Sequence, residues 1–278
     1  MIRRNPLLFL ILIFVFLQIF CVTPLAYSVD ADIVIYADTR SNHDIHRNVV
    51  SAILKVKPSV VFHLGDFVDT GSSAADWAAF NDVAGPLLKT TEFYPVIGNH
   101  EGDSELFFRN FKLPENRTWY SVERAGIHFT ILNSNADLIP NSPQYQWLES
   151  DLRSVNDKIR FRIVLMHEPI FSVVRSTVSR KRFKSSLLPL FARYGIAAVF
   201  SGHDHAYERF LYKNIYYIAT GGGGANLHNQ RRTSLYLQKF IKDHHFCALT
   251  VIDGFIKVSV FDTNLNLIDE FNIPPRKR

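Results

Sequence analysis

The chain has 278 residues, of which 47% are hydrophobic and 21% charged, so it is long enough for one large domain with a substantial core. Its formal charge of +5 is a mild excess, which favours a small anionic ligand over a dedicated nucleic-acid-binding role. The two cysteines, Cys21 and Cys247, exclude a scaffold built on several disulfides.

The first 28 residues have the pattern of a secretory signal. Arg3 and Arg4 precede an apolar stretch over residues 7–20, and small or turn-forming residues follow at 24–28. We expect residues 1–28 to be removed on export to the periplasm or the extracellular space, with residues 29–278 forming the folded domain. An uncleaved anchor, which would attach the protein to a membrane, is the alternative, because the apolar run extended through Val22 approaches the length of a span.

Helices and strands alternate in the first two thirds of the chain. Apolar spacing predicts helices over residues 44–56, 72–88, 144–155 and 185–194. A hairpin is predicted over residues 119–133, turned at Ala125-Gly126, and the strand-rich last third has a turn at Asp253-Gly254. This order of elements favours two facing sheets with helices outside.

Five short apolar runs each end in residues that can hold a metal. The residues after these runs are Asp38, Asp66, Asn99-His100, His167 and His203-Asp204-His205. Continuous apolar runs are typical of buried strands, and the carboxyl ends of such strands line the ligand crevice of an α/β sheet. Oxygen and imidazole ligands without thiolates suit Mn, Fe, Zn, Ni or Mg. The set is too large for one ion, so we predict a two-metal site.

The order of these motifs resembles the calcineurin-like metallophosphoesterases over residues 32 to 225. The string from His203 to Arg209 is similar to the purple acid phosphatase branch. The resemblance implies an α/β fold, a four-layer α/β/β/α sandwich of two mixed sheets, for residues 29–278. It also implies two divalent or mixed-valence ions (Fe, Mn, Zn or Ni) at the strand ends.

The family pattern also implies roles for individual residues. Asp66 would bridge the two ions; the remaining ligands would be Asp38 and His205 at the first site, and Asn99, His167 and His203 at the second. A hydroxide held by the two metals would attack a phosphomonoester or phosphodiester in line. His100 would protonate the leaving group, and Asp69 would orient the His100 imidazole or, alternatively, cap the next helix.

Arg40 departs from the pattern. Many members have a metal-binding histidine at this position, whereas the purple acid phosphatases supply a tyrosine at the position of Asp69; this chain has neither. Arg40 is suited to bind a phosphate in a bidentate pair. It could instead mark a weakened first metal site, and the protein would then be a degenerate, non-catalytic phosphate- or metal-binding relative. His43 or His46 could replace the missing ligand, although both are expected in the loop and the first helical turn.

Several further residues have structural or substrate-binding interpretations. Gly221 to Gly224 should allow a close backbone approach to the site. His63 is expected in the core. His228, His244 and His245 are expected in solvent-exposed loops, with the lining of the cleft as the alternative. The basic residues between Arg175 and Lys184 are either a solvated loop or a rim that collects small anionic phosphate esters.

Overall fold

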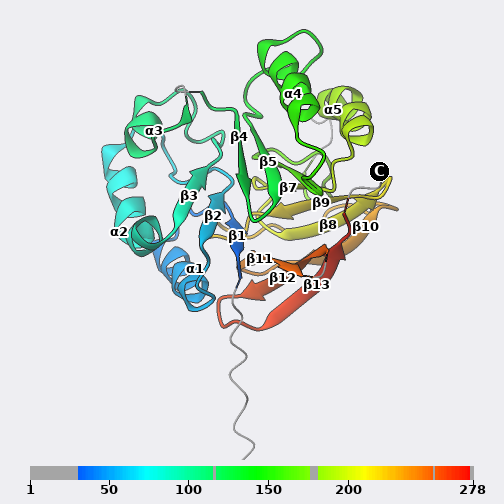
Figure 1. Cartoon of the computed structure of the whole chain (residues 1–278). Helices are drawn as coiled ribbons and strands as arrows, with labels where there is room; N and C mark the ends of the chain where they lie inside the picture. The colour runs from blue at the N-terminus through cyan, green and yellow to red at the C-terminus, as the bar shows by residue number, and fades with distance from the viewer. Residues whose placement is uncertain (1–30, 115–116, 176–180, 253, 276–278) are drawn as a thin grey trace, which may run out of the picture.

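The computed structural model describes residues 31–275 except 115–116, 176–180 and 253 (Figure 1). The predicted signal over residues 1–28 lies outside the described part of the chain. Among the described helices, none combines the length and apolar character needed to cross a membrane.

The first sheet joins the beginning and the end of the described chain. Its order is β13-β12-β11-β1-β2-β3, with bounds β1 (Ile33–Tyr36), β2 (Val60–His63), β3 (Glu92–Pro95), β11 (His245–Ile252), β12 (Phe255–Asp262) and β13 (Leu267–Ile273). β1, β2 and β3 run parallel, whereas β11 pairs antiparallel with β1. Pro95 is the last residue of β3, and it is tolerated there because β3 is an edge strand.

The second sheet has seven strands in the order β10-β8-β9-β7-β6-β5-β4. Their bounds are β4 (Tyr120–Arg124), β5 (Ile127–Leu132), β6 (Phe161–Met166), β7 (Ala198–Ser201), β8 (Tyr207–Tyr212), β9 (Ile215–Thr220) and β10 (Leu237–Ile241). β4 and β5 form the predicted hairpin. The strands β5, β6 and β7 are parallel to one another. Both sheets are therefore mixed.

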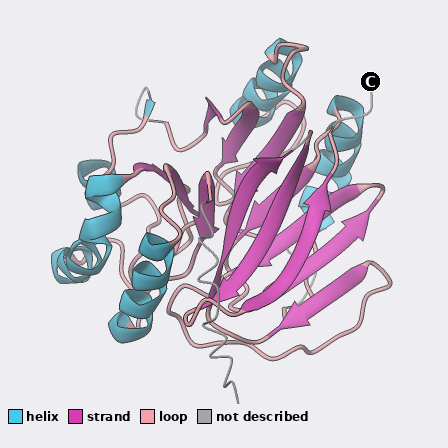
Figure 2. Cartoon of the chain, turned by 60° about the horizontal axis from the view of Figure 1, so that its bottom comes forward, coloured by secondary structure: helices cyan, strands magenta, loops and turns pink. Residues whose placement is uncertain are grey.

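The helices form the two outer layers (Figures 1 and 2). Their bounds are α1 (His43–Lys55), α2 (Ala74–Thr90), α3 (Glu105–Asn110), α4 (Pro143–Ser154) and α5 (Lys181–Tyr194). Asn42, Ser73 and Ser142 cap α1, α2 and α4 by accepting a backbone N–H with their side chains. The four predicted helices are confirmed. The six-residue α3 was not predicted, because it is too short to show a period.

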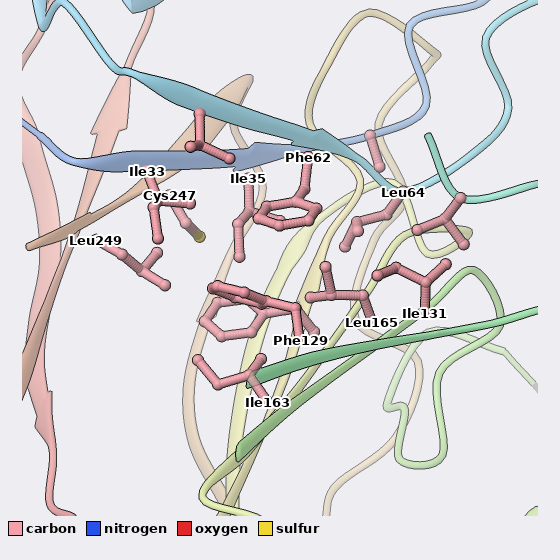
Figure 3. Close-up of a cluster of buried hydrophobic side chains, with 14 of the residues drawn as sticks. Ile33, Ile35, Phe62, Leu64, Phe129, Ile131, Ile163, Leu165, Cys247 and Leu249 are labelled. Atoms are coloured by element: carbon pink, nitrogen blue, oxygen red, sulfur yellow. The ribbon is translucent and has the colours of Figure 1, made fainter. Parts of the chain in front are cut away.

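Alternate side chains of a buried strand such as β1 pack into two different cores, one between the sheets and one between the sheet and its helices. Ile33 and Ile35 face the second sheet, whereas Val34 and Tyr36 face α1. Between the sheets the rings of Phe62 and Phe129 lie 4.5 Å apart (Figure 3). A third cluster packs α4 and α5 on the second sheet. The four-layer α/β/β/α sandwich is confirmed, and each buried large side chain stabilises it by about 1.5–3 kcal/mol.

Candidate metal centre

The structure brings together all six predicted metal ligands at one edge of the sandwich. Asp38 and Asp66 follow β1 and β2, and Asn99 follows β3 after a short extension. His167 follows β6 directly, and His203 and His205 follow β7. Carboxyl ends of strands from both sheets therefore meet at this edge, as the strand-end pattern predicts.

One group of ligand atoms contains Asp66, His167 and His203, together with the amide oxygen of Asn99. His167 Nε2 lies 3.2 Å from Asp66 Oδ1 and 3.0 Å from Asn99 Oδ1. His203 Nδ1 lies 2.9 Å from Asn99 Oδ1 and 3.3 Å from His167 Nε2. Four ligand atoms thus surround one point.

A second group contains Asp38, Asp66 and His205, all of them buried. His205 Nε2 lies 3.4 Å from Asp38 Oδ1. Both atoms are buried without a hydrogen-bond partner in the described structure, although each belongs to a strongly polar group. Burial of such atoms is costly unless a cation or donor satisfies them.

These separations fit shared coordination. Two ligands bound at about 2.1 Å to one ion lie about 3.0 Å apart at a right angle and about 3.4 Å apart at a tetrahedral angle. The ligand separations of 2.9, 3.0, 3.2, 3.3 and 3.4 Å all lie within 0.1 Å of this range. Asp66 belongs to both groups and can bridge two ions.

The backbone fixes the tautomers of two histidines. His167 Nδ1 donates to the carbonyl of Leu64 at 2.7 Å, and His205 Nδ1 donates to the carbonyl of Asn226 at 2.8 Å. Because a carbonyl oxygen can only accept, Nδ1 is the donor in each ring, and Nε2 is the nitrogen that faces the candidate metal position.

Three residues of the ligand loops have an uncommon left-handed backbone conformation, and a neighbouring glycine leaves space for their loops. Asp38, Asp66 and His203 have φ values of 60°, 57° and 67°, in the left-handed region that is uncommon for residues with a side chain. Glycine makes room beside them: a Cβ on Gly221 would lie 2.4 Å from the carbonyl oxygen of Asp204 and 2.8 Å from Asp38 Oδ2. The predicted close approach of the glycine-rich turn is confirmed.

Charge at the centre is concentrated on Asp66. Burial opposes ionisation of its carboxyl, but the neighbouring His167 and His100 outweigh this and lower the pKa of Asp66 far below its usual value. Burial lowers the pKa of His167, yet the carboxylates of Asp66 and Asp38 raise it to about 10. The pocket therefore favours ionised carboxylates and attracts positive charge.

The predicted proton donor, His100, lies beside the shared carboxylate. Its Nδ1 donates to the backbone carbonyl of Asp69 at 2.7 Å, and its Nε2 lies 3.8 Å from Asp66 Oδ2. Asp69 contacts this ring through its backbone carbonyl and not through its carboxylate. That carboxylate instead accepts from Ser41 Oγ and from Arg40, and Ser73 caps α2.

Arg40 lies against the same centre. Its Nε is 3.5 Å from Asp66 Oδ2, and its Nη1 donates to Asp69 Oδ1 at 2.9 Å. We predicted that the Arg40 guanidinium would bind a phosphate, but its Nη1 already donates to the Asp69 carboxylate. Neither proposed replacement ligand reaches the site, because His43 is exposed and His46 is buried in the core beneath α1.

The match to known proteins agrees with this geometry. Residues 31–207 match the sequence profile of the calcineurin-like phosphoesterases. The chain belongs to this family. Over 175 residues it is 31% identical to purple acid phosphatase 21 of Arabidopsis thaliana, covering 53% of this chain and 40% of that protein.

Two further similarities bear on the assignment. Over 202 residues the chain is 25% identical to probable inactive purple acid phosphatase 9 of Arabidopsis thaliana, covering 58% of this chain and 31% of that one. The solved purple acid phosphatase from yellow lupin (Lupinus luteus) seeds has the same fold, with a TM-score of 0.77, 20% identity and coverage of 87% and 53%. This calcineurin-like phosphoesterase thus spans less than half of the curated relatives that it matches.

Glu101 was not predicted as a site residue, although it follows His100 directly. Its buried carboxylate accepts the backbone N–H groups of Asp66 at 2.9 Å and Gly98 at 2.8 Å. It also accepts the N–H of Phe67 at 2.8 Å. Burial and the Asp66 charge raise the pKa of Glu101 to about 7, while these donors act in the opposite direction. Glu101 therefore joins the loops after β2 and β3 that carry the candidate ligands.

The histidines of the last third are not the exposed loop residues that the sequence suggests. His245 is fully buried at the start of β11, and His244 is partly buried beneath the glycine-rich turn. His228 stacks on His205 with ring centroids 4.1 Å apart. No local pattern marks His228, because its neighbour in space is 23 residues away in sequence. His63 lies in the core, as predicted, and bonds Thr39 Oγ1 at 3.1 Å.

Proposed function

We propose that this protein is an exported, metal-dependent phosphoric ester hydrolase that acts on a small phosphomonoester or phosphodiester. The observation that carries the proposal is the pair of ligand groups that share Asp66 at one edge of the sandwich. Two ions bound there would supply a hydroxide nucleophile and stabilise both the attacking and the leaving oxygen of an in-line displacement.

The residues of this chain have separate tasks in that reaction. Asp66 would be a ligand of both ions, and the other candidate ligands would complete the two coordination groups. His100 donates the proton on Nε2 to the leaving oxygen as the ester bond breaks, so that an alcohol is released instead of an alkoxide. The Asp69 carbonyl on Nδ1 keeps the ring aimed at the centre. Arg40 adds positive charge beside the oxygens where negative charge develops.

A degenerate, non-catalytic relative is the second candidate, and Arg40 is the observation that favours it. Its Nε lies 3.5 Å from the carboxylate that would bridge the ions, and it stands at the position where the pattern of many family members has a metal-binding histidine. A fixed guanidinium near Asp66 would reduce the affinity of the first site for a cation. One of the curated relatives is itself described as probably inactive.

Metal analysis combined with turnover distinguishes the two candidates. We expect the purified protein to hold two ions per chain and to hydrolyse an aryl phosphomonoester, an aryl phosphodiester or both. Asp66→Asn should lower metal content and activity together, since the bridging carboxylate serves both ions. The exposed Asp82→Asn on α2 is the matched control and should retain both.

Two results would contradict the proposal. A wild-type protein that binds one ion or none and turns over neither ester would be the degenerate relative. Full metal content with normal turnover in Asp66→Asn would exclude the shared-ligand arrangement. Export is tested separately, by mass analysis of the protein from its native host: a chain that begins near residue 27 or 29 supports cleavage, and an intact N-terminus on the membrane fraction supports the anchor.

A further inference from the structure

His228 is attached to a candidate metal ligand by three contacts. Its Nδ1 accepts the backbone N–H of His205 at 3.1 Å, and its own N–H donates to the carbonyl of His205 at 2.7 Å. The two rings stack at an interplanar angle of 13°. Because Nδ1 is the acceptor, Nε2 carries the hydrogen, and the partly exposed ring offers it as a donor beside the metal centre.

Two arginines lie around this histidine. Arg175 Nε is 3.3 Å from Oδ1 of Asp204, the buried residue between the ligands His203 and His205. Arg231 follows His228 by three residues and is exposed. Asp204 is the neighbour in sequence of His205, on whose ring His228 stacks, so Arg175 and His228 both contact the same short ligand loop.

Backbone contacts hold the two arginine segments together. The carbonyl of Val173 accepts the N–H groups of Arg231 at 2.8 Å and of Arg232 at 3.0 Å. The N–H of Val173 donates at 2.7 Å to Glu208, whose side chain is fully buried. The loops after β6 and β9 are thus joined, and the side chains that extend from them lose less freedom on binding a ligand.

We propose that His228, Arg175 and Arg231 form a second oxyanion site beside the metal centre, which binds a second phosphate or carboxylate group of the substrate. The inference rests on the proposed function, because the first phosphate is the one that the metals hold. His228 contacts His205 directly, so the two anionic groups must be joined by a short linker. Guanidinium and imidazole N–H donors are matched to such oxyanions.

Binding of three stable probes to the metal-loaded full-length protein tests this site. Methylphosphonate has one anionic group, methylenediphosphonate has two phosphonates, and phosphonoacetate has a phosphonate and a carboxylate. The measurement is the calorimetric Kd of each in buffer with excess metal. We expect at least one two-anion probe to bind about tenfold more tightly than methylphosphonate, and this advantage should decrease with salt. Which probe gains more identifies the second group as phosphate or carboxylate.

Three variants measure how much each arginine contributes to binding of the second anionic group. Arg231→Gln should reduce the two-anion advantage by roughly tenfold, the lower end for a lost charge-assisted hydrogen bond at an exposed site. Arg232→Gln is the matched control, because Arg232 is exposed and bonds the same carbonyl; it should keep the advantage. Arg175→Lys keeps a charge beside Asp204 but removes the planar fork, and it should also reduce the advantage; an unchanged advantage would exclude Arg175 from the site.

Two outcomes would overturn the inference. The Kd ratio between two-anion and one-anion probes could be the same in wild type, Arg231→Gln and Arg232→Gln. Alternatively, Arg231→Gln could weaken methylphosphonate as much as the two-anion probes, which would place Arg231 at the first phosphate. Because the readout is binding, absence of ester hydrolysis would contradict the proposed function alone and leave this test intact.

Discussion

Replacement of His46 by Phe should make the protein less sensitive to acid. His46 lies on the buried face of α1, and its ring stacks on Phe80 with centroids 5.6 Å apart. Both of its ring nitrogens are buried without a hydrogen-bond partner in the described structure. Burial, with smaller effects from His43 and Arg47, lowers the pKa of His46 to about 3. The unfolded chain, in contrast, should titrate near the ordinary histidine value of about 6.5.

The direction and size of the effect follow from linkage. Between pH 6.5 and pH 3 the unfolded chain binds a proton at this residue that the folded chain does not, so stability falls as pH falls through this window. Each pH unit below about 6.5 costs about 1.4 kcal/mol, which gives about 2 kcal/mol at pH 5. For a domain of this size that corresponds to about 4–8 °C in Tm.

The assay is urea unfolding of the metal-free protein at several pH values between 8 and 5. Chelation removes the separate effect of acid on metal binding. Other buried histidines, including His245, contribute equally to wild type and His46→Phe, so the difference between their slopes isolates His46. The exposed His43→Gln on the same helix is the control and should follow wild type closely.

Stability at pH 8 is not decisive for this prediction. Removal of two unsatisfied nitrogens stabilises the core, whereas the larger Phe ring can strain it, and each effect is worth about 1–3 kcal/mol. The slope with pH depends only on the titrating group. Equal slopes for wild type and His46→Phe would refute the argument that this imidazole is buried in its neutral form.

Three predictions concern the metal centre. Glu101→Gln should lower metal affinity by about 10–100-fold, because an amide N–H₂ group would face the backbone N–H groups that the carboxylate now accepts; unchanged affinity by metal titration would contradict this. His100→Ala should slow hydrolysis of esters with poor leaving groups by about 10²–10⁴-fold while acidic phenols are affected far less, and equal losses on both would exclude a proton-donor role. Arg40→Ala should raise KM or lower kcat with metal content unchanged if Arg40 binds phosphate; a gain in bound metal would instead identify it as the cause of a weakened first site.

The sequence alone predicted most of the elements and the candidate ligand set. The buried strands β1, β2, β6 and β7 are short apolar runs, and the polar residue after each run is visible without a structure. Helical spacing gave α1, α2, α4 and α5, because an amphipathic helix repeats its apolar face locally. β8, β10 and β13 were not predicted. β10 and β13 are edge strands with weaker burial patterns, and β8 has the charged Glu208 and Arg209 within its run.

Only the tertiary structure decided how the site is arranged. Which atom of Asp69 meets His100, and whether Arg40 faces Asp66 or a substrate, depends on how separate loops meet. The tautomer of His205 is set by a carbonyl 21 residues further along the chain, and His228 reaches the same ring from 23 residues away. Such contacts leave no periodic signal, because the packing of one sheet against the other brings together loops that are distant in the sequence. The sequence therefore specifies which groups can bind metal, and the packing of the two sheets specifies their protons, partners and accessible faces.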